Sequence, residues 1–384
     1  MLQIVSFGGA ALYSGVWCLR LAGSSAEEGL WKQLRLFSLM VCMGSVAGAA
    51  GWAANMQTNA LYYQSGPLYG SGRAYYALTA SSDRYQAAFS VIYGFEFVCL
   101  IISKLMLLGR LAANATHSSQ ADVPGMSSVR RRWLNGRALP IVYRFMVAAV
   151  VAGSAVCMVA SDVTAAYTMQ QAQLQDQAAA ACDAQGNDTN SSLALAFAAT
   201  TAGDTTDTAQ AVQASVEALT LLLVTVAFVV IVCWSIAIFR LAERASAHAL
   251  LSAHDANNMR ASEANAASIV TGTMQAAADN RRRLTAACVI VLVTFPARAA
   301  FDLLYAYAGF NSPINPACAT CGPCQSTGYL INTWLDYTPE LQPIVVAVSS
   351  PLPLTLSLWL LTKAHARARL IAANVQRLRV GDGV

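Results

Sequence analysis

Charged residues are scarce in this chain. Asp, Glu, Lys and Arg together make up 11% of its 384 residues, whereas apolar residues make up 56%. Soluble proteins average about 25% charged residues, so the composition indicates a membrane protein. The net charge is +4, and the basic residues are unevenly distributed along the chain. This charge gives no reason to expect a nucleic-acid-binding surface.

Long apolar stretches are abundant. A membrane helix needs about 20 mostly apolar residues to cross about 30 Å of hydrocarbon. We therefore expect an all-α, polytopic fold, a seven-helix membrane domain over 1–370 with a tail at 371–384. The first apolar stretch could also be a signal peptide. We interpret it as a helix because no basic segment precedes it. The seven expected spans are 2–19, 34–54, 87–109, 140–161, 216–239, 285–308 and 341–362.

Basic residues are nearly absent from alternate connections between these spans. Together, 55–86, 162–215 and 309–339 contain two Lys or Arg residues, against nineteen in the other connections and the C-terminal segment. Since Lys and Arg are retained on the cytosolic side, the pattern predicts a lumenal or extracellular N-terminus and a cytosolic C-terminus. A basic cytosolic surface should then anchor helix ends at anionic headgroups or, alternatively, dock a cytosolic partner. Its residues are Arg130, Arg131, Arg132, Arg281, Arg282 and Arg283.

Two long connections have distinct compositions. We expect 162–215 to be a long lumenal loop, in which Asn187 and Asn190 each begin an Asn-X-Ser/Thr glycosylation pattern. The cytosolic connection 240–283 is rich in Ala and has no Pro. It should therefore extend the fifth helix before becoming mobile.

Ionisable residues inside the spans are expensive and are candidates for function. Glu96 in the third span and Arg298 in the sixth lie about 15 Å from the lumenal end of their helices, counted at about 1.5 Å per residue. We expect them to form an ion pair with Asp302 one turn from the arginine, and we interpret this polar cluster as a structural lock between helices. A proton or ion pathway is the alternative. Lys104 and Arg144 lie near enough to the cytosolic end to reach the membrane surface.

The segment "NPACATCGPC" concentrates three cysteines in a connection predicted to be lumenal. A metal site would need a fourth ligand, and catalytic redox use would need a thioredoxin-like frame. We instead expect two disulfides, because the lumenal connections hold four cysteines and disulfides persist outside the cytosol. Cys182 should take one partner in the segment, and all three pairings remain open. The four are Cys182, Cys318, Cys321 and Cys324.

Several functional classes lack their motifs. A retinal protein needs a lysine deep in its last helix, but Lys363 lies at the cytosolic exit. The Asp-Arg-Tyr of a rhodopsin-type receptor occurs at 83–85, at the lumenal entrance of the third span rather than at its cytosolic end. No nucleophile elbow, phosphate loop or zinc-protease motif is present. We therefore expect no enzyme, no cofactor and no metal.

Three segments carry a resemblance to a known family: "GLWKQLRLFSLM" before the second span, "LTAACVIVLVTFPARAAFDLLYAYAGF" in the sixth and "SSPLPLTLSLWLLTK" in the seventh. They resemble the seven-helix tobamovirus multiplication (THH/TOM) family. The lumenal connections are longer than is usual in that family, and the N-terminal segment is shorter. The positions that match the family pattern are Phe37, Leu39, Met40, Arg298, Pro351 and Lys363.

The resemblance implies a receptor-like membrane scaffold of the vacuolar, endomembrane or plasma membrane, surrounded by membrane lipids. It also implies a cytosolic partner such as an Arf-like small GTPase, and no catalysis. The alternative is an orphan G-protein-coupled receptor that binds a G protein. A transporter that uses Glu96 and Arg298 ranks third.

Overall fold

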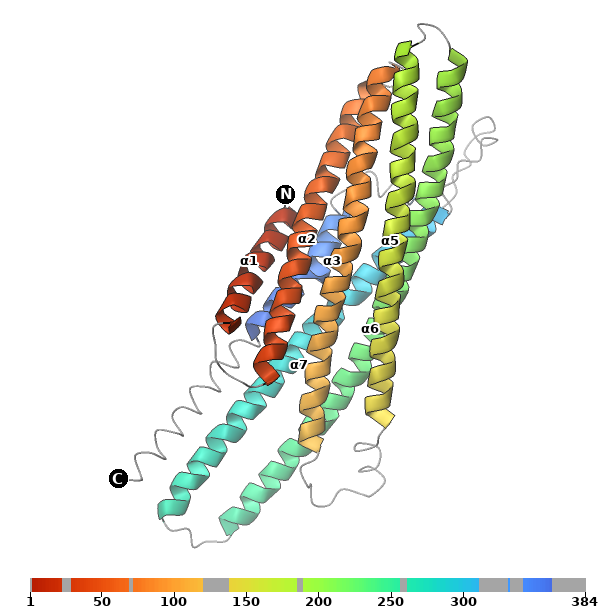
Figure 1. Cartoon of the computed structure of the whole chain (residues 1–384). Helices are drawn as coiled ribbons and strands as arrows, with labels where there is room; N and C mark the ends of the chain where they lie inside the picture. Colours follow the sequence, from red (N-terminus) through yellow and green to blue (C-terminus); the bar gives the residue numbers. More distant parts are fainter. Residues whose placement is uncertain are drawn as a thin grey trace. The chain divides into compact units, whose positions relative to one another are not determined.

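The computed structural model describes residues 2–22, 29–68, 72–119, 138–184, 189–255, 261–310, 331 and 341–360. Within these ranges every regular element is helical (Figure 1). Ser350 forms a turn, and a further helical segment follows it at 351–360. The elements are α1 (Leu2–Ala22), α2 (Gly29–Ser65), the 3-10 turn η1 (Gly66–Leu68), α3 (Arg73–Ser119), α5 (Ala138–Ala184), α6 (Thr189–Asp255), α7 (Ala261–Phe310) and α9 (Leu341–Ser349).

Six of these helices, α1, α2, α3, α5, α6 and α7, are long and apolar enough to cross a membrane. Their outward faces carry large apolar side chains, of which Leu12 and Phe145 are both 74% exposed. Such faces are favourable in lipid and unfavourable in water, so the fold is that of an integral multi-pass membrane protein. The expected seventh span consists of α9 and 351–360, and its apolar part, Ile344–Leu360, is shorter than the other six.

The helices extend well beyond their apolar stretches. α5 continues to Ala184 and α6 begins at Thr189, so the expectation of a long loop over 162–215 needs correction: 162–184 and 189–215 are helical. The hydropathy of the sequence indicates where a helix leaves the hydrocarbon core of the membrane. The helix itself ends only where helix propensity and packing no longer favour it. These segments are rich in Ala and have no Pro, which favours helix in water as well. With 67 residues, α6 is about 100 Å long.

The contacts divide the chain into two compact units, which we describe separately. The first contains Met1–Ser103, Ala149–Leu223 and Phe295–Leu352, and the second contains Lys104–Ala148, Val224–Thr294 and Pro353–Val384. All the residues of the candidate site described below belong to the first unit.

Close helix packing in the first unit depends on small residues. The Gly44 and Gly48 pair, spaced as in a GxxxG motif, brings α2 against two neighbours. A Cβ added to Gly44 would lie 2.8 Å from Leu100 Cδ2 of α3, and one added to Gly48 would overlap the ring of Phe7 in α1. Small residues at this spacing are typical of closely packed membrane helices. α1 and α2 are also tied by a hydrogen bond from Ser38 Oγ to the Ser14 carbonyl at 2.5 Å.

α5 and α6 also pack through small side chains. Gly153 of α5 lies against Thr220 of α6, and Gly203 of α6 lies against Gln171 of α5. Buried positions recur along both helices, and most of them carry small side chains. Examples of such residues are Ala165, Thr168, Ala172, Ala199, Thr206 and Ala211.

The second unit contains the continuations of α3, α5, α6 and α7. In this unit, a Cβ added to Gly109 of α3 would overlap the Tyr143 hydroxyl of α5. Ser357 Oγ donates a hydrogen bond to the Ala287 carbonyl of α7 at 3.5 Å. Lys104, which we expected to reach the cytosolic membrane surface, is instead 1% exposed. That expectation was wrong because this face of α3 is turned toward protein rather than toward the membrane surface.

Candidate functional site

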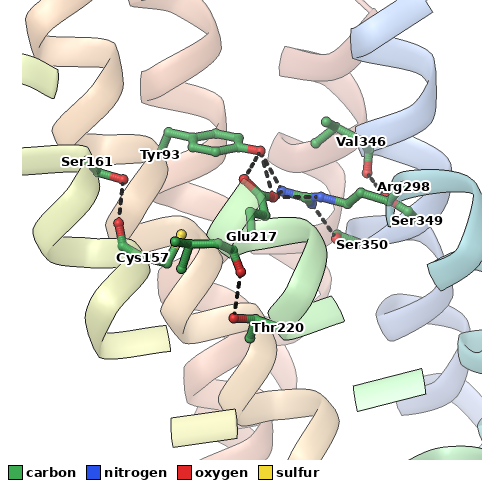
Figure 2. Close-up of polar contacts among 10 residues, drawn as sticks. Tyr93, Cys157, Ser161, Glu217, Thr220, Arg298, Val346, Ser349 and Ser350 are labelled. Atoms are coloured by element: carbon green, nitrogen blue, oxygen red, sulfur yellow. Dashed lines mark hydrogen bonds and ion pairs between the residues drawn. The ribbon is translucent and has the colours of Figure 1, made fainter. Parts of the chain in front are cut away.

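Among the described residues of the first unit, Arg298 is the centre of the most extensive buried polar network (Figure 2). It lies on α7, two residues after Pro296, which is accommodated within the helix. Its side chain is 2% exposed. A fully ionised guanidinium at this burial is stable only if protein groups replace the water that it has lost.

Glu217 of α6 supplies the compensating charge. Arg298 Nε donates to Glu217 Oε1 at 3.0 Å, and Arg298 Nη2 donates to the same oxygen at 2.5 Å. The Glu217 side chain is 3% exposed. The pair thus joins α6 to α7 through charge-assisted hydrogen bonds, which are shorter and stronger than neutral ones.

Two hydroxyl groups complete the network. Tyr93 of α3 accepts a hydrogen bond from Arg298 Nη2 at 2.7 Å, and its own hydroxyl lies 2.8 Å and 3.0 Å from the two carboxylate oxygens of Glu217, to which it donates. Ser350 Oγ accepts from Arg298 Nη1 at 2.9 Å. Four N–H bonds of the guanidinium therefore have partners, out of the five that an arginine carries.

Aromatic rings enclose the guanidinium on the α3 side. The Arg298 Cζ atom lies 5.6 Å from the ring centroid of Tyr93 and 5.6 Å from that of Phe97. Because these residues are four apart on α3, both rings lie on one face of that helix. A desolvated cation within about 6 Å of a ring centroid is attracted by the negative face of the ring.

Ser350 occupies an interruption between two helical segments. α9 ends at Ser349, Ser350 forms a turn whose N–H donates to the Val346 carbonyl at 3.1 Å, and helix resumes at Pro351. Pro351 directly follows this turn, and proline has no N–H for the helical ladder. The break turns the Ser350 hydroxyl toward Arg298 (Figure 2).

The network lies at the depth of lipid-facing residues. On α5, Val156 and Val159 are exposed on either side of buried Cys157, and on α6, Leu219 and Leu222 are exposed within two turns of Glu217. Water is therefore replaced by hydrocarbon outside the bundle at this level. The arrangement can hold one cation and one anion in a fixed geometry that ties α3, α6, α7 and the end of α9 together.

The ion pair that the structure shows for Arg298 is with Glu217, an acid that the expected cluster of Glu96, Arg298 and Asp302 did not include. Glu96 and Asp302 are both buried, at 1% and 7% exposure, and both act electrostatically on Arg298. Tyr93, which contacts Arg298, lies one turn before Glu96 on α3, so Glu96 lies near the level of the arginine. The rotation of the helices about their axes, which decides which acid meets the arginine, cannot be read from residue counts.

Sequence reasoning missed Glu217, Tyr93 and Ser350. Glu217 is the second residue of the apolar stretch 216–239. Its position suggested a side chain at the membrane surface rather than one inside the bundle. A signal did exist: the spacing of small buried residues on α6 runs through Ala211, Ala214 and Glu217 without a break, which places Glu217 on the interior face.

The remaining predicted site residues lie apart from this network. Cys182 is half-buried and forms no disulfide with another described cysteine, while Cys318, Cys321 and Cys324 lie outside the described residues, as do Asn187 and Arg130 to Arg132. Asn190 lies in the first turn of α6, and Arg281 to Arg283 lie on α7. The described residues contain no group of His, Cys, Asp and Glu side chains suited to a metal ion.

Comparisons of the chain with protein-family models, with curated proteins and with solved structures found no match. The functional argument therefore depends on the fold and the site.

Proposed function

We propose that this chain is a seven-helix membrane protein that acts without catalysis, as a scaffold or receptor-like protein that presents a cytosolic surface to a partner. The observation that carries this proposal is the length of α6 and α7. Past the apolar stretches, α6 remains helical over 240–255 and α7 is helical over 261–284. At about 1.5 Å per residue these extensions are about 24 Å and 36 Å long, far more than anchoring a membrane helix requires.

The charge pattern supports a cytosolic position for these extensions, which we call the helical arm (240–255 and 261–284). Arg281, Arg282 and Arg283 stand where the arm meets the apolar part of α7. These three arginines would hold the arm at an anionic membrane surface. They would also complement the charge of an acidic protein surface. With the resemblance to the THH/TOM family, this favours an Arf-like small GTPase as the partner, on a vacuolar, endomembrane or plasma membrane.

In this proposal the Arg298 network is a lock that sets the geometry of the bundle. Four guanidinium N–H bonds are already satisfied by Glu217, Tyr93 and Ser350. A ligand anion would have to displace a carboxylate from a buried pair, which leaves an unpaired charge and is strongly unfavourable.

The test is recovery of partners by the tagged full chain from membranes of its own cells. We expect an Arf-like GTPase to be recovered, and we expect a variant with Arg281, Arg282 and Arg283 all changed to Ala to lose it. The matched control is Arg84→Ala, which removes an exposed basic residue on the opposite side of the membrane. Recovery of a heterotrimeric G protein would favour a receptor, and unchanged recovery by the triple variant would refute the arm as the docking site.

The break at Ser350 favours transport as a second candidate. Transporters bind substrate and ions where discontinuous helices meet near the middle of the membrane, and Arg298 bonds to the residue at this break. A transporter would lose flux on Glu217→Gln while its folded yield stayed normal. Proton flux measured with a pH-sensitive dye inside proteoliposomes separates the two functions, because a lock changes stability and a transporter changes flux.

A further inference from the structure

Asp83 of α3 and Gln175 of α5 form a second polar tie, outside the apolar stretches 87–109 and 140–161. Their sequence neighbours Arg84 and Asp176 form an ion pair across the same two helices, with side chains that are 50% and 40% exposed. Exposed charges of this kind require water. The tie therefore lies in the aqueous extension of α3 and α5, beyond the hydrocarbon.

The hydrogen bonding of this tie is incomplete in a specific way. The Gln175 amide donates to the Asp83 carboxylate, yet Asp83 Oδ2 and Gln175 Oε1 are both buried and accept no hydrogen bond. Both atoms are acceptors, so neither can satisfy the other. Buried polar atoms without a partner are rare and call for an explanation. Here one proton placed between the two acceptors would give both of them a hydrogen bond.

We propose that Asp83 is a proton-binding site. A proton on Oδ2 lets the carboxylic acid donate to Gln175 Oε1 while Oδ1 accepts from the Gln175 amide, which closes a two-bond acid–amide ring between α3 and α5. Loss of the proton removes one of these two hydrogen bonds and weakens the tie. No co-reactant is needed, because the proton is exchanged with the surrounding water.

The groups around Asp83 agree with this role. On α3 and α5 the charged residues next to Asp83 and Gln175 in the sequence, Arg84 and Asp176, are paired with each other. α2 is joined to α3 at this point by the hydrogen bond from Ser82 Oγ to the Thr58 carbonyl, and its segment 51–65 contains no Asp, Glu, Lys, Arg or His. On α6, Gly203 lies against Gln171, which is one turn before Gln175 on α5. The residue after Gly203, Asp204, is exposed.

Burial raises the pKa of Asp83 to about 7, and the hydrogen bond from Gln175 offsets part of this rise. An ordinary aspartate has a pKa of about 3.9. The tie is therefore closed in a mildly acidic compartment and open at alkaline pH. The site would make the apposition of α3 and α5 sensitive to the pH of the compartment that this end of the protein faces.

Infrared spectra of the purified full chain, titrated from mildly acidic to mildly alkaline pH, test the proposal directly. Protonated carboxyl groups have a C=O stretching band that carboxylates lack. We expect one such band to be half lost near pH 7 and to be absent in Asp83→Asn. The matched control, Asp176→Asn, removes an exposed acid one residue away and should leave the band unchanged.

Gln175→Leu provides an independent readout that keeps Asp83. It removes the amide, so the band should persist but shift in frequency because its hydrogen bond is lost. A wild-type spectrum without a band that titrates near neutral pH would overturn the proposal, whatever the variants do. So would a band that Asp83→Asn retains, since it would belong to another acid. Disappearance of the band when sodium chloride replaces choline chloride at constant pH would assign the site to a cation instead.

Discussion

Removing Arg298 should be among the most damaging single changes to this protein. In Arg298→Leu, the Glu217 carboxylate loses both of its arginine hydrogen bonds and keeps only the Tyr93 hydroxyl, in a site where its side chain is 3% exposed. Breaking a buried pair by removing one partner costs about 3–5 kcal/mol. Each 1.4 kcal/mol is a factor of about ten in an equilibrium constant, so the ratio of folded to unfolded protein should fall about 10²- to 10⁴-fold.

The double variant Glu217→Leu/Arg298→Leu separates a charge effect from a packing effect. Replacing both members of a buried pair by apolar residues is often neutral or stabilising, so the double variant should recover most of the loss seen in Arg298→Leu. A cavity or a clash would instead persist or grow. The assay is thermal and denaturant unfolding of detergent-purified protein, with yield of monodisperse protein as a second measure.

An exposed pair in the same unit is the control for this cycle. Arg84→Leu breaks the ion pair with Asp176, whose partners are about half exposed, and exposed pairs contribute about 0–1 kcal/mol. If Arg298→Leu destabilised the protein no more than Arg84→Leu, the network would not be a lock. A double variant no more stable than Arg298→Leu would show that the damage comes from shape rather than from the unpaired carboxylate.

Three further predictions follow from local geometry. Gly48→Leu should destabilise the protein by about 1–3 kcal/mol through overpacking against α1, whereas Gly8→Leu, whose new Cβ meets nothing within 4 Å, should unfold like the wild type. Ser350→Ala removes the acceptor of Arg298 Nη1 and should cost about 1–3 kcal/mol, while Ser81→Ala, on an exposed face, should be nearly neutral in the same unfolding assay. Because the pKa of Asp83 is raised to about 7, its contribution to stability is fully present below the ordinary value of about 3.9. That contribution is lost as pH rises through about 7, so the melting temperature should fall over this range in the wild type and stay level in Asp83→Asn.

The helical fold and the apolar parts of six helices could be predicted from sequence because membrane helices are specified by length and hydropathy alone. The ends of the helices could not. Residues 162–184 are polar, and polar composition outside the membrane was interpreted as a loop, although this segment has the Ala content and the lack of Gly and Pro that favour helix. Where a helix leaves the hydrocarbon core, the side chains become more polar, but the backbone can remain helical.

The candidate site was predicted in part for a similar reason. A buried arginine in an apolar stretch is conspicuous, so Arg298 could be identified from sequence, and Pro351 marked the break beside it. The partner of Arg298 depends on helix rotation, and Glu96 and Glu217 are equally acidic. Both acids are buried, so burial alone does not choose between them. Glu217 continues the series of small interior residues on α6, and α3 presents Tyr93 and Phe97 to the guanidinium at this level.

The two polar ties of the first unit differ because they lie in different solvents. At the depth of Glu217 the bundle is surrounded by hydrocarbon, so a carboxylate must be matched by a resident cation, and Arg298 supplies one through a group that never loses its proton. At the level of Asp83 water is one residue away, as the exposed Arg84 shows, and a proton from solvent can do what a resident cation does deeper in the bundle. The Asp83 tie lies between α3 and α5, whereas the Arg298 network ties α3 to α6 and α7. Loss of the proton at Asp83 can therefore loosen α5 from α3 without breaking the hydrogen bonds of Arg298.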